Sequence, residues 1–229
     1  MQDKTVRDEL AQLGRKLYAD GLVAGPGGNI SARAGDRVYL SPSGFAFDEL
    51  RPEDYIGMDL RSGRVVEGRH RPTSEFLMHL ACYEVREDVR AVVHTHPRYT
   101  IALSSAGHDI KAMIADFHIY THSNIPHLEY LTVTTPELAA AVKSRVAGAN
   151  ALVLRNHGAV TLGSNLKEAY YRMLSLEEGA QIQWLATQVG MPRFLTRQHL
   201  QDLDALGSEK YRRSLLADPQ GADVEPDRR

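Results

Sequence analysis

The 229-residue chain carries 27 Lys and Arg residues against 29 Asp and Glu residues, which gives a formal net charge of -2 at pH 7. This balance excludes a global basic field that would recruit nucleic acid or an anionic membrane surface. Hydrophobic residues make up 43% and charged residues 24%, as in a globular protein with a sizeable core. The one cysteine, Cys82, excludes an internal disulfide framework. The charged N-terminal segment and the absence of a long apolar run predict a soluble, cytoplasmic protein with no membrane partner.

Helical and strand-like patterns are interspersed along the sequence. Leu10, Leu13 and Leu17 recur at helical spacing before Gly21, which predicts a first helix of about four turns. Short β-branched or alternating runs predict strands over 37–40, 55–60, 64–67, 91–96, 151–155 and 159–162. Further helices are expected to begin at 72–75, at 97 and at 135–137, and the longest is expected over 165–188.

The spacing of these elements favours one fold class. Several predicted strand pairs lie too close in sequence for the helical crossover that parallel strands require. We therefore expect an α/β protein whose mixed or antiparallel sheet is flanked by helices. Residues 1–216 are expected to form a single domain. Residues 217–229, rich in Pro, Gly and Asp, are expected to form a disordered tail.

The sharpest local motif is His94-Thr95-His96, at the end of a predicted strand. Residues two apart on a strand share a face, so the two imidazoles are expected to point the same way. Two neutral imidazoles at this spacing suit one zinc-like ion when a third ligand joins them. His157, in a turn between two predicted strands, is the candidate third ligand. Taken alone, each of these histidines also fits an ordinary polar position at a strand end or turn.

Glu75 follows two hydroxyl residues at a predicted helix start. One interpretation is a simple interaction with the helix dipole. The other is a carboxylate held beside the metal as a ligand or general base. His79 lies one turn further along, and its pairing with Glu75 at a metal is the minority interpretation. A helical histidine between Met78 and Leu80 is more often structural.

Three segments offer backbone N–H groups to an anion. The glycine-rich turn before Asn29 and the turn with Ser43 and Gly44 can form nests of N–H groups. Thr73 and Ser74 lie at a helix N-terminus, which also favours anions. Each segment alone is a weak signal, because glycine and serine populate ordinary turns. The sequence has no Walker or Rossmann glycine pattern, so nucleotide binding has no support.

Taken together, these segments resemble the class II aldolase/adducin family, and within it the L-fuculose-1-phosphate aldolase group. The motifs GGNIS, SPSG, PTSE, HTHP and NHG occur in the family's order over about residues 5–190. The resemblance implies a three-layer α/β/α fold around a mainly antiparallel sheet. It also implies a cyclic homotetramer with sites between subunits.

The resemblance further implies the chemistry of the site. His94, His96 and His157 would bind a divalent metal, usually Zn²⁺, with Mn²⁺ or Co²⁺ as alternatives. Glu75 would be a metal ligand in the resting site and the acid/base during turnover. The substrate phosphate would be held by Asn29, Ser43, Gly44, Thr73 and Ser74. The implied reaction cleaves a ketose 1-phosphate to dihydroxyacetone phosphate and an aldehyde through an enediolate, which the metal's charge stabilises.

The family's tyrosine proton donor has no clean match, because Ala115 stands at that position. The candidate replacements are Asp116, His118, Tyr120 and Tyr130. Rival functions on the same scaffold are a decarboxylase, an epimerase or a dehydratase acting on a sugar phosphate or sugar acid. A non-catalytic, adducin-like binding module is a further alternative, although such modules lack the three metal histidines that this chain keeps.

Overall fold

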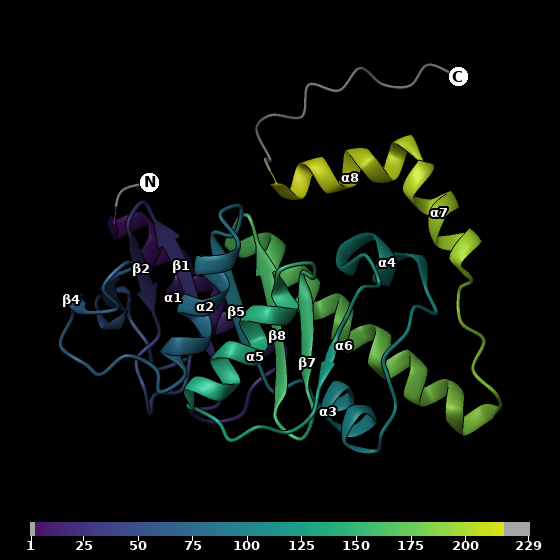
Figure 1. Ribbon diagram of the computed structural model, residues 1–229, viewed down its shortest axis with the longest axis horizontal. Coiled ribbons are helices and arrows are strands. Elements are labelled where there is room, and N and C mark those ends of the chain that lie inside the picture. The colour runs from purple at the N-terminus through teal and green to yellow at the C-terminus, as the bar shows by residue number, and fades with distance from the viewer. Residues whose placement is uncertain (1–2, 218–229) are drawn as a thin grey trace.

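The computed structural model describes residues 3–217, in which helices cover both faces of an eight-stranded sheet (Figure 1). The strands are β1 (Asn29–Ala34), β2 (Arg37–Leu40), β3 (Ile56–Asp59), β4 (Val65–Glu67), β5 (Ala91–Thr95), β6 (His127–Leu128), β7 (Ala151–Leu154) and β8 (Gly158–Gly163). The helices are α1 (Asp3–Ala19), α2 (Phe76–Val85), α3 (Arg98–Ser105), α4 (Ala115–Thr121), α5 (Pro136–Val146), α6 (Leu166–Val189), α7 (Arg197–Ala205) and α8 (Gly207–Ala217). The tail expected after residue 217 lies outside the described residues.

The sheet has the order β4-β3-β2-β1-β5-β8-β7-β6. All neighbouring pairs of these strands are antiparallel except β6 and β7. Short turns join β1 to β2, β3 to β4 and β7 to β8, as antiparallel pairing permits. The central pair β1 and β5 places Asn29 opposite His94. The predicted α/β class with a mainly antiparallel sheet is therefore confirmed.

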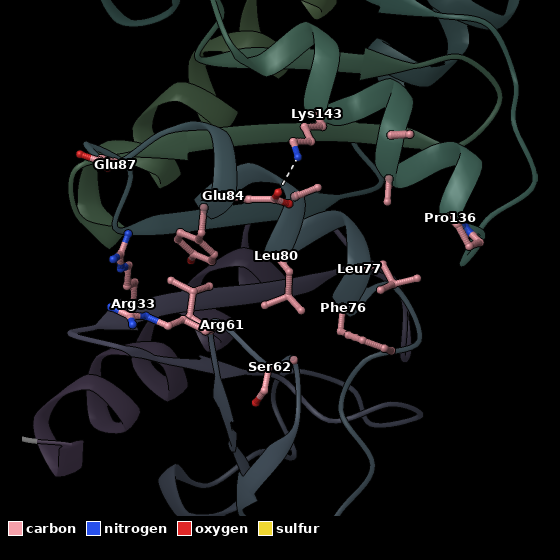
Figure 2. A pocket seen from close by; sticks show the side chains of 16 residues that line it. Arg33, Arg61, Ser62, Phe76, Leu77, Leu80, Glu84, Glu87, Pro136 and Lys143 are labelled. Atoms are coloured by element: carbon pink, nitrogen blue, oxygen red, sulfur yellow. Dashed lines mark hydrogen bonds and ion pairs between the residues drawn. The ribbon is translucent and has the colours of Figure 1, made fainter.

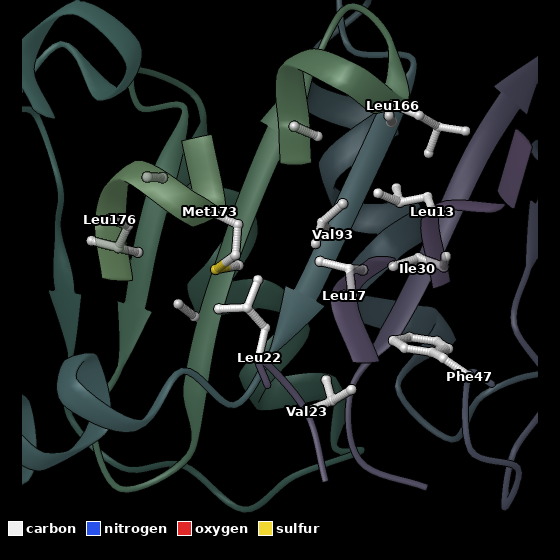
Figure 3. Packing of buried hydrophobic residues seen from close by; sticks show 14 of the residues in the cluster. Leu13, Leu17, Leu22, Val23, Ile30, Phe47, Val93, Leu166, Met173 and Leu176 are labelled. Atoms are coloured by element: carbon white, nitrogen blue, oxygen red, sulfur yellow. The ribbon is translucent and has the colours of Figure 1, made fainter. Parts of the chain in front are cut away.

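Two apolar clusters, one on each face of the sheet, make up the core. Helices α1, α3, α4 and α6 cover the first cluster, in which Leu17, Val93 and Met173 are buried (Figure 3). Helices α2 and α5 cover the second, which contains Val92. Val92 and Val93 serve opposite clusters because successive side chains of a strand point to opposite faces. This alternation produces the three layers.

Five helices and strands were not predicted from the sequence: β1, α4, β6, α7 and α8. Helix α4 is two turns long and β6 has two residues, so neither produces a sustained periodic pattern. Helices α7 and α8 lie apart from the sheet and close to α4 in Figure 1. Within residues 3–217, no helix combines the length and the apolar character needed to cross a membrane.

Candidate active site

The three candidate metal ligands meet where β5 ends and β8 begins, at one end of the strands of the sheet. His94 lies near the end of β5, His96 directly follows that strand, and His157 occupies the turn between β7 and β8. The ring centroids of His94 lie 5.1 Å from His96 and 4.7 Å from His157. One ring nitrogen from each histidine lies within 4.8 Å of the other two. The three imidazoles therefore have the spacing needed to share one metal ion.

Two glycines leave the space that these imidazoles occupy. A Cβ atom on Gly27 would lie 2.9 Å from His96 Nδ1. A Cβ atom on Gly158 would collide with the Thr95 carbonyl oxygen and lie 3.1 Å from His94 Cε1. The glycines of the GGN and NHG motifs thus allow close approach of backbone and imidazole, which a Cβ would prevent.

Glu75 reaches the same cluster from the other side. Helix α2 begins at Phe76, so Glu75 is the residue just before it, and its backbone N–H donates to Thr73 Oγ1 (3.2 Å). Glu75 Oε2 lies 3.2 Å from His94 Nε2, and Oε1 lies 3.4 Å from His157 Nε2. Thr73 and Ser74, expected at a helix N-terminus, thus directly precede the N-cap residue Glu75, whose carboxylate faces the histidines.

Burial and mutual charge set the protonation states of this cluster. Burial raises the pKa of Glu75, but His94 and the hydrogen bond from Asn29 outweigh it and hold this pKa well below its ordinary range. Burial, together with the charge of His94, lowers the pKa of both His96 and His157 to about 4. At neutral pH, Glu75 is therefore ionised, and both imidazoles are neutral, as metal ligands must be.

Several buried polar atoms of the cluster fit a cation. His94 Nε2, His96 Nε2 and Glu75 Oε1 have no hydrogen-bond partner among the described residues. Buried polar atoms in native proteins are normally paired. The other nitrogen of His94, Nδ1, lies 3.0 Å from the carbonyl oxygen of Ala159. Donation of the Nδ1 proton to that carbonyl leaves the Nε2 lone pair for an ion, the arrangement usual for metal-bound histidines.

The two loops predicted to bind an anion lie side by side. An antiparallel bridge pairs Pro42 with Pro72, and the Thr73 N–H donates to the Ser41 carbonyl oxygen (3.0 Å). Ser43, Gly44 and Ser74 are exposed, and Thr73 is buried. The chain thereby gathers four of the five candidate phosphate residues on adjoining loops.

Asn29, the fifth candidate, faces Glu75. It is buried, and its Nδ2 donates to Glu75 Oε2 (2.9 Å). Its Oδ1 lies 2.6 Å from Nε2 of the buried His79. The alternative pairing of His79 with Glu75 at a metal is not what the structure shows, because this imidazole contacts Asn29 and Ser31 instead.

His79 belongs to a buried polar cluster that sequence reasoning missed. Its Nδ1 lies 2.7 Å from Ser31 Oγ, which in turn lies 2.8 Å from the hydroxyl of Tyr83. Burial lowers the pKa of His79 to about 3, so this imidazole is neutral. A signal was present: Glu75, His79 and Tyr83 share one face of a helix, and Asn29 and Ser31 share one face of a strand.

Three of the four candidate proton donors are engaged elsewhere. Asp116 and the Tyr120 hydroxyl both contact the Arg212 guanidinium, at 3.2 Å and 3.1 Å. His118 Nε2 lies 3.1 Å from a carboxylate oxygen of Asp204. These contacts join α4 to the two C-terminal helices.

Tyr130 lies at the same end of the strands as the three histidines. It follows β6, which runs parallel to β7, and β7 leads directly into the turn with His157. The Arg155 N–H donates to the Leu128 carbonyl oxygen (2.9 Å), which ties the ends of these two strands together. Tyr130 is exposed. Its position therefore makes it the candidate donor closest in topology to the histidines.

A cavity of about 940 Å³ lies away from this cluster. Figure 2 shows it beside α2 and α5, with Phe76, Leu77 and Leu80 of α2 around it and the Lys143–Glu84 ion pair at its margin. Its lining includes Tyr83 but no residue of the histidine cluster. The buried titratable groups of the histidine cluster, rather than this cavity, therefore mark the candidate site.

Comparison with known proteins points to one family. The family model described as class II aldolase and adducin N-terminal domain matches residues 8–184. A 5-deoxy-D-ribulose 1-phosphate aldolase of Bacillus thuringiensis serovar kurstaki is 35% identical over 199 residues, which cover 86% of this chain and 92% of that protein. An L-fuculose phosphate aldolase of Methanococcus maripaludis is also 35% identical, over 77% of this chain and 95% of that protein.

Solved structures give the same result. A structure described as L-fuculose 1-phosphate aldolase superposes with a TM-score of 0.83 at 31% identity, covering 91% of this chain and 96% of that one. The chain belongs to the class II aldolase and adducin N-terminal domain family. It is an aldolase, an enzyme that breaks or forms a carbon–carbon bond.

Proposed function

We propose that this aldolase cleaves a ketose 1-phosphate between C3 and C4 to dihydroxyacetone phosphate and an aldehyde. The observation that carries the proposal is the Glu75 carboxylate, held beside the ring nitrogens of His94 and His157. An ionised carboxylate beside a metal-binding cluster is the arrangement that proton transfer next to a polarised carbonyl requires.

His94, His96 and His157 are proposed to hold one divalent ion. Their unpartnered buried nitrogens and the low pKa of His96 and His157 support this assignment. Imidazole is a common ligand of Zn²⁺, and Mn²⁺ or Co²⁺ are the alternative ions. The ion would supply Lewis-acid polarisation of the substrate carbonyl.

The remaining residues are proposed to bind and orient the substrate. Ser43, Gly44, Thr73 and Ser74 lie on the two bridged loops and would hold the phosphate at the far end of the ketose. Holding that end would align C3 and C4 with Glu75, which would exchange the proton. Asn29, first expected to bind phosphate, would act mainly on Glu75.

Tyr130 is the proposed second proton-transfer residue. Tyr130 is exposed and lies at the same end of the strands as His157. Tyr120, in contrast, contacts Arg212 through its hydroxyl. We expect Tyr130→Phe to lower kcat by about 10²–10⁴-fold, the usual range for a general acid or base. Tyr120→Phe is the matched control and should retain kcat. Equal kcat in both variants would remove Tyr130 from the mechanism.

A homotetramer with sites between subunits is proposed for the assembly. Val189 and Met191, at and beyond the end of α6, are 90% and 93% exposed, and Trp184 and Leu185 are also exposed. Exposed apolar side chains gathered at one helix end suit an interface with another copy. Light scattering of the purified protein tests the assembly. The cytoplasmic location stays a prediction from the sequence.

The substrate is proposed to be a deoxyketose 1-phosphate. Carbon counting shows that 5-deoxyribulose 1-phosphate would give acetaldehyde and L-fuculose 1-phosphate would give lactaldehyde, with dihydroxyacetone phosphate from both. The test incubates metal-loaded protein with both compounds and with their unphosphorylated ketoses, and measures dihydroxyacetone phosphate and aldehyde. Release of both products with a strong preference for the phosphorylated form supports the proposal.

The rival reactions are separated when sugar acids are added to the substrates and all products are analysed. Release of carbon dioxide from a sugar acid would indicate a decarboxylase. A change of configuration without fragmentation would indicate an epimerase, and loss of water would indicate a dehydratase. Any of these three outcomes, without aldehyde from any ketose 1-phosphate, contradicts the proposed cleavage.

A further inference from the structure

We propose that His79, with Ser31 and Tyr83 behind it, is a positioning residue that fixes the Asn29 amide and through it the Glu75 carboxylate. The five side chains form one buried chain of contacts, from the Tyr83 hydroxyl to Glu75 Oε2. The inference rests on the proposed role of Glu75 as the group that exchanges the substrate proton.

Hydrogen-bond chemistry fixes the direction of the first half of this chain. An ionised carboxylate only accepts, so Asn29 must present its NH₂ group to Glu75. Asn29 Oδ1 then faces His79 and accepts, which requires the proton of the neutral imidazole to be on Nε2. The chain therefore selects a single tautomer of His79.

The second half of the chain follows from this tautomer. With its proton on Nε2, His79 has a bare Nδ1, which accepts from the Ser31 hydroxyl. Because the Ser31 hydroxyl donates its proton to His79, Ser31 Oγ accepts a hydrogen bond from the Tyr83 hydroxyl. Each donor is matched to one acceptor, from Tyr83 on α2 through Ser31 on β1 and back to His79 on α2.

Burial gives this chain its effect on Glu75. Ser31 and His79 are 0% exposed and Tyr83 is 2% exposed, so water cannot replace a lost partner. Asn29 anchors Oε2 of the carboxylate, whereas Oε1 has no hydrogen-bond partner within the described residues. The chain thus orients the carboxylate with one oxygen held and the other left for the substrate proton.

Two replacements of His79 separate positioning from packing. His79→Leu fills the space but removes both hydrogen bonds. His79→Gln places an amide where Nε2 stands, so it keeps a donor for Asn29. We expect His79→Leu to lower kcat about 10–100-fold, with little change in KM or bound metal. We expect His79→Gln to recover most of that loss.

A matched pair of tyrosine variants provides a milder test. Tyr83→Phe removes only the hydroxyl that donates to Ser31. Tyr55→Phe removes an equally buried hydroxyl that donates to the Leu10 carbonyl oxygen, away from the cluster. We expect both variants to lose thermal stability, but only Tyr83→Phe to lose kcat. Equal kcat in the two variants, or equal losses in His79→Leu and His79→Gln, would overturn the proposal.

The tautomer provides a readout that needs no substrate. In protein labelled with ¹⁵N-histidine, the His79 signals, assigned by their loss in His79→Gln, should show a protonated Nε2 and a bare Nδ1 at pH 7. A protonated Nδ1 would overturn the inference. If wild-type protein cleaves no ketose 1-phosphate, the proposed function fails, and this spectrum still decides the direction of the chain.

Discussion

Glu75 and His79 are both buried titratable side chains of the same helical segment, yet their surroundings leave Glu75 ionised and His79 neutral. Glu75 faces imidazoles and an amide N–H group, which together favour the ionised carboxylate. His79 faces an amide and a hydroxyl, and burial together with the charge of His94 outweighs the nearby Glu75 carboxylate, so the pKa of His79 is lowered and its imidazole is neutral. Strongly perturbed pKa values of buried side chains cluster at functional sites, which supports the placement of the site around these residues.

Replacement of Glu75 tests this chemistry at a single residue. Glu75→Gln keeps the size of the side chain but removes the base, so kcat should fall by about 10²–10⁴-fold. Metal content must be measured on the same sample, because the amide carbonyl is a weak ligand. Glu84→Gln, on the exposed side of α2, is the control and should keep full activity. Near wild-type turnover of Glu75→Gln with full metal would contradict its role as the acid/base.

Most elements that carry the site were predictable because their signals are local. The two-residue spacing of His94 and His96 requires only a strand, and the NHG turn requires only two adjoining strands. The N-cap at residue 75 was not predictable, because three neighbouring positions were chemically suitable and long-range contacts with β1 and β5 decided among them. The buried cluster around His79 was missed for the same reason. Its partners lie on β1, far away in sequence.

The turn between β7 and β8 is the element on which the third histidine depends. Gly158→Ala should force β8 away from Thr95 and displace the rings of His94 and His96. Overpacking of this kind typically costs about 1–3 kcal/mol. We expect a lower Tm together with weaker metal binding, measured by thermal scanning and metal titration.

Gly148→Ala is the matched control for this experiment. A Cβ atom there meets no atom of residues 3–217 within 4 Å, so both quantities should stay close to those of the wild type. Unchanged metal affinity in Gly158→Ala would show that the histidine cluster tolerates a shift of the turn.

At the scale of the molecule, both apolar clusters pack on one sheet. The strands β5 and β8, which position the histidines, are therefore fixed by the core on both faces. The sequence predicted this architecture because strand pairing and apolar spacing repeat over many residues. It did not predict α4, α7 and α8, and the contacts among these three helices include single charged pairs such as Arg212 with Asp116. Pairs of this kind have no periodic signature.

The metal-free protein should lose stability as the pH falls from about 7 to about 4. His79, His96 and His157 have folded-state pKa values of about 3, 4 and 4, below the ordinary value of 6.5. Between pH 7 and pH 4 these imidazoles are therefore protonated in the unfolded chain but not in the folded one. This difference in bound protons lowers the free energy of unfolding. Thermal scans of chelator-treated protein across this range measure the slope.

Two histidine variants identify the source of that slope. His157→Asn removes one of the depressed groups and should flatten the dependence of Tm on pH. His108→Asn changes an exposed histidine and should leave the dependence intact. Identical slopes in the two variants would place the origin of the acid sensitivity elsewhere.

Adding a divalent ion at pH 7 should raise the Tm of the wild type, because the ion binds only the folded chain.

The pairing of β8 with β5 has a consequence for the lifetime of a bound ion. This pairing brings the turn with His157 against the two histidines of β5, whereas α3, α4 and α5 intervene along the chain. A molecule in which β8 has separated from β5 keeps only two of the three proposed ligands. Escape of the ion is then coupled to local opening of the sheet, and its rate should follow the hydrogen-exchange rates of the amides in β5 and β8. The dissociation kinetics of the metal would thus report on the opening of the sheet.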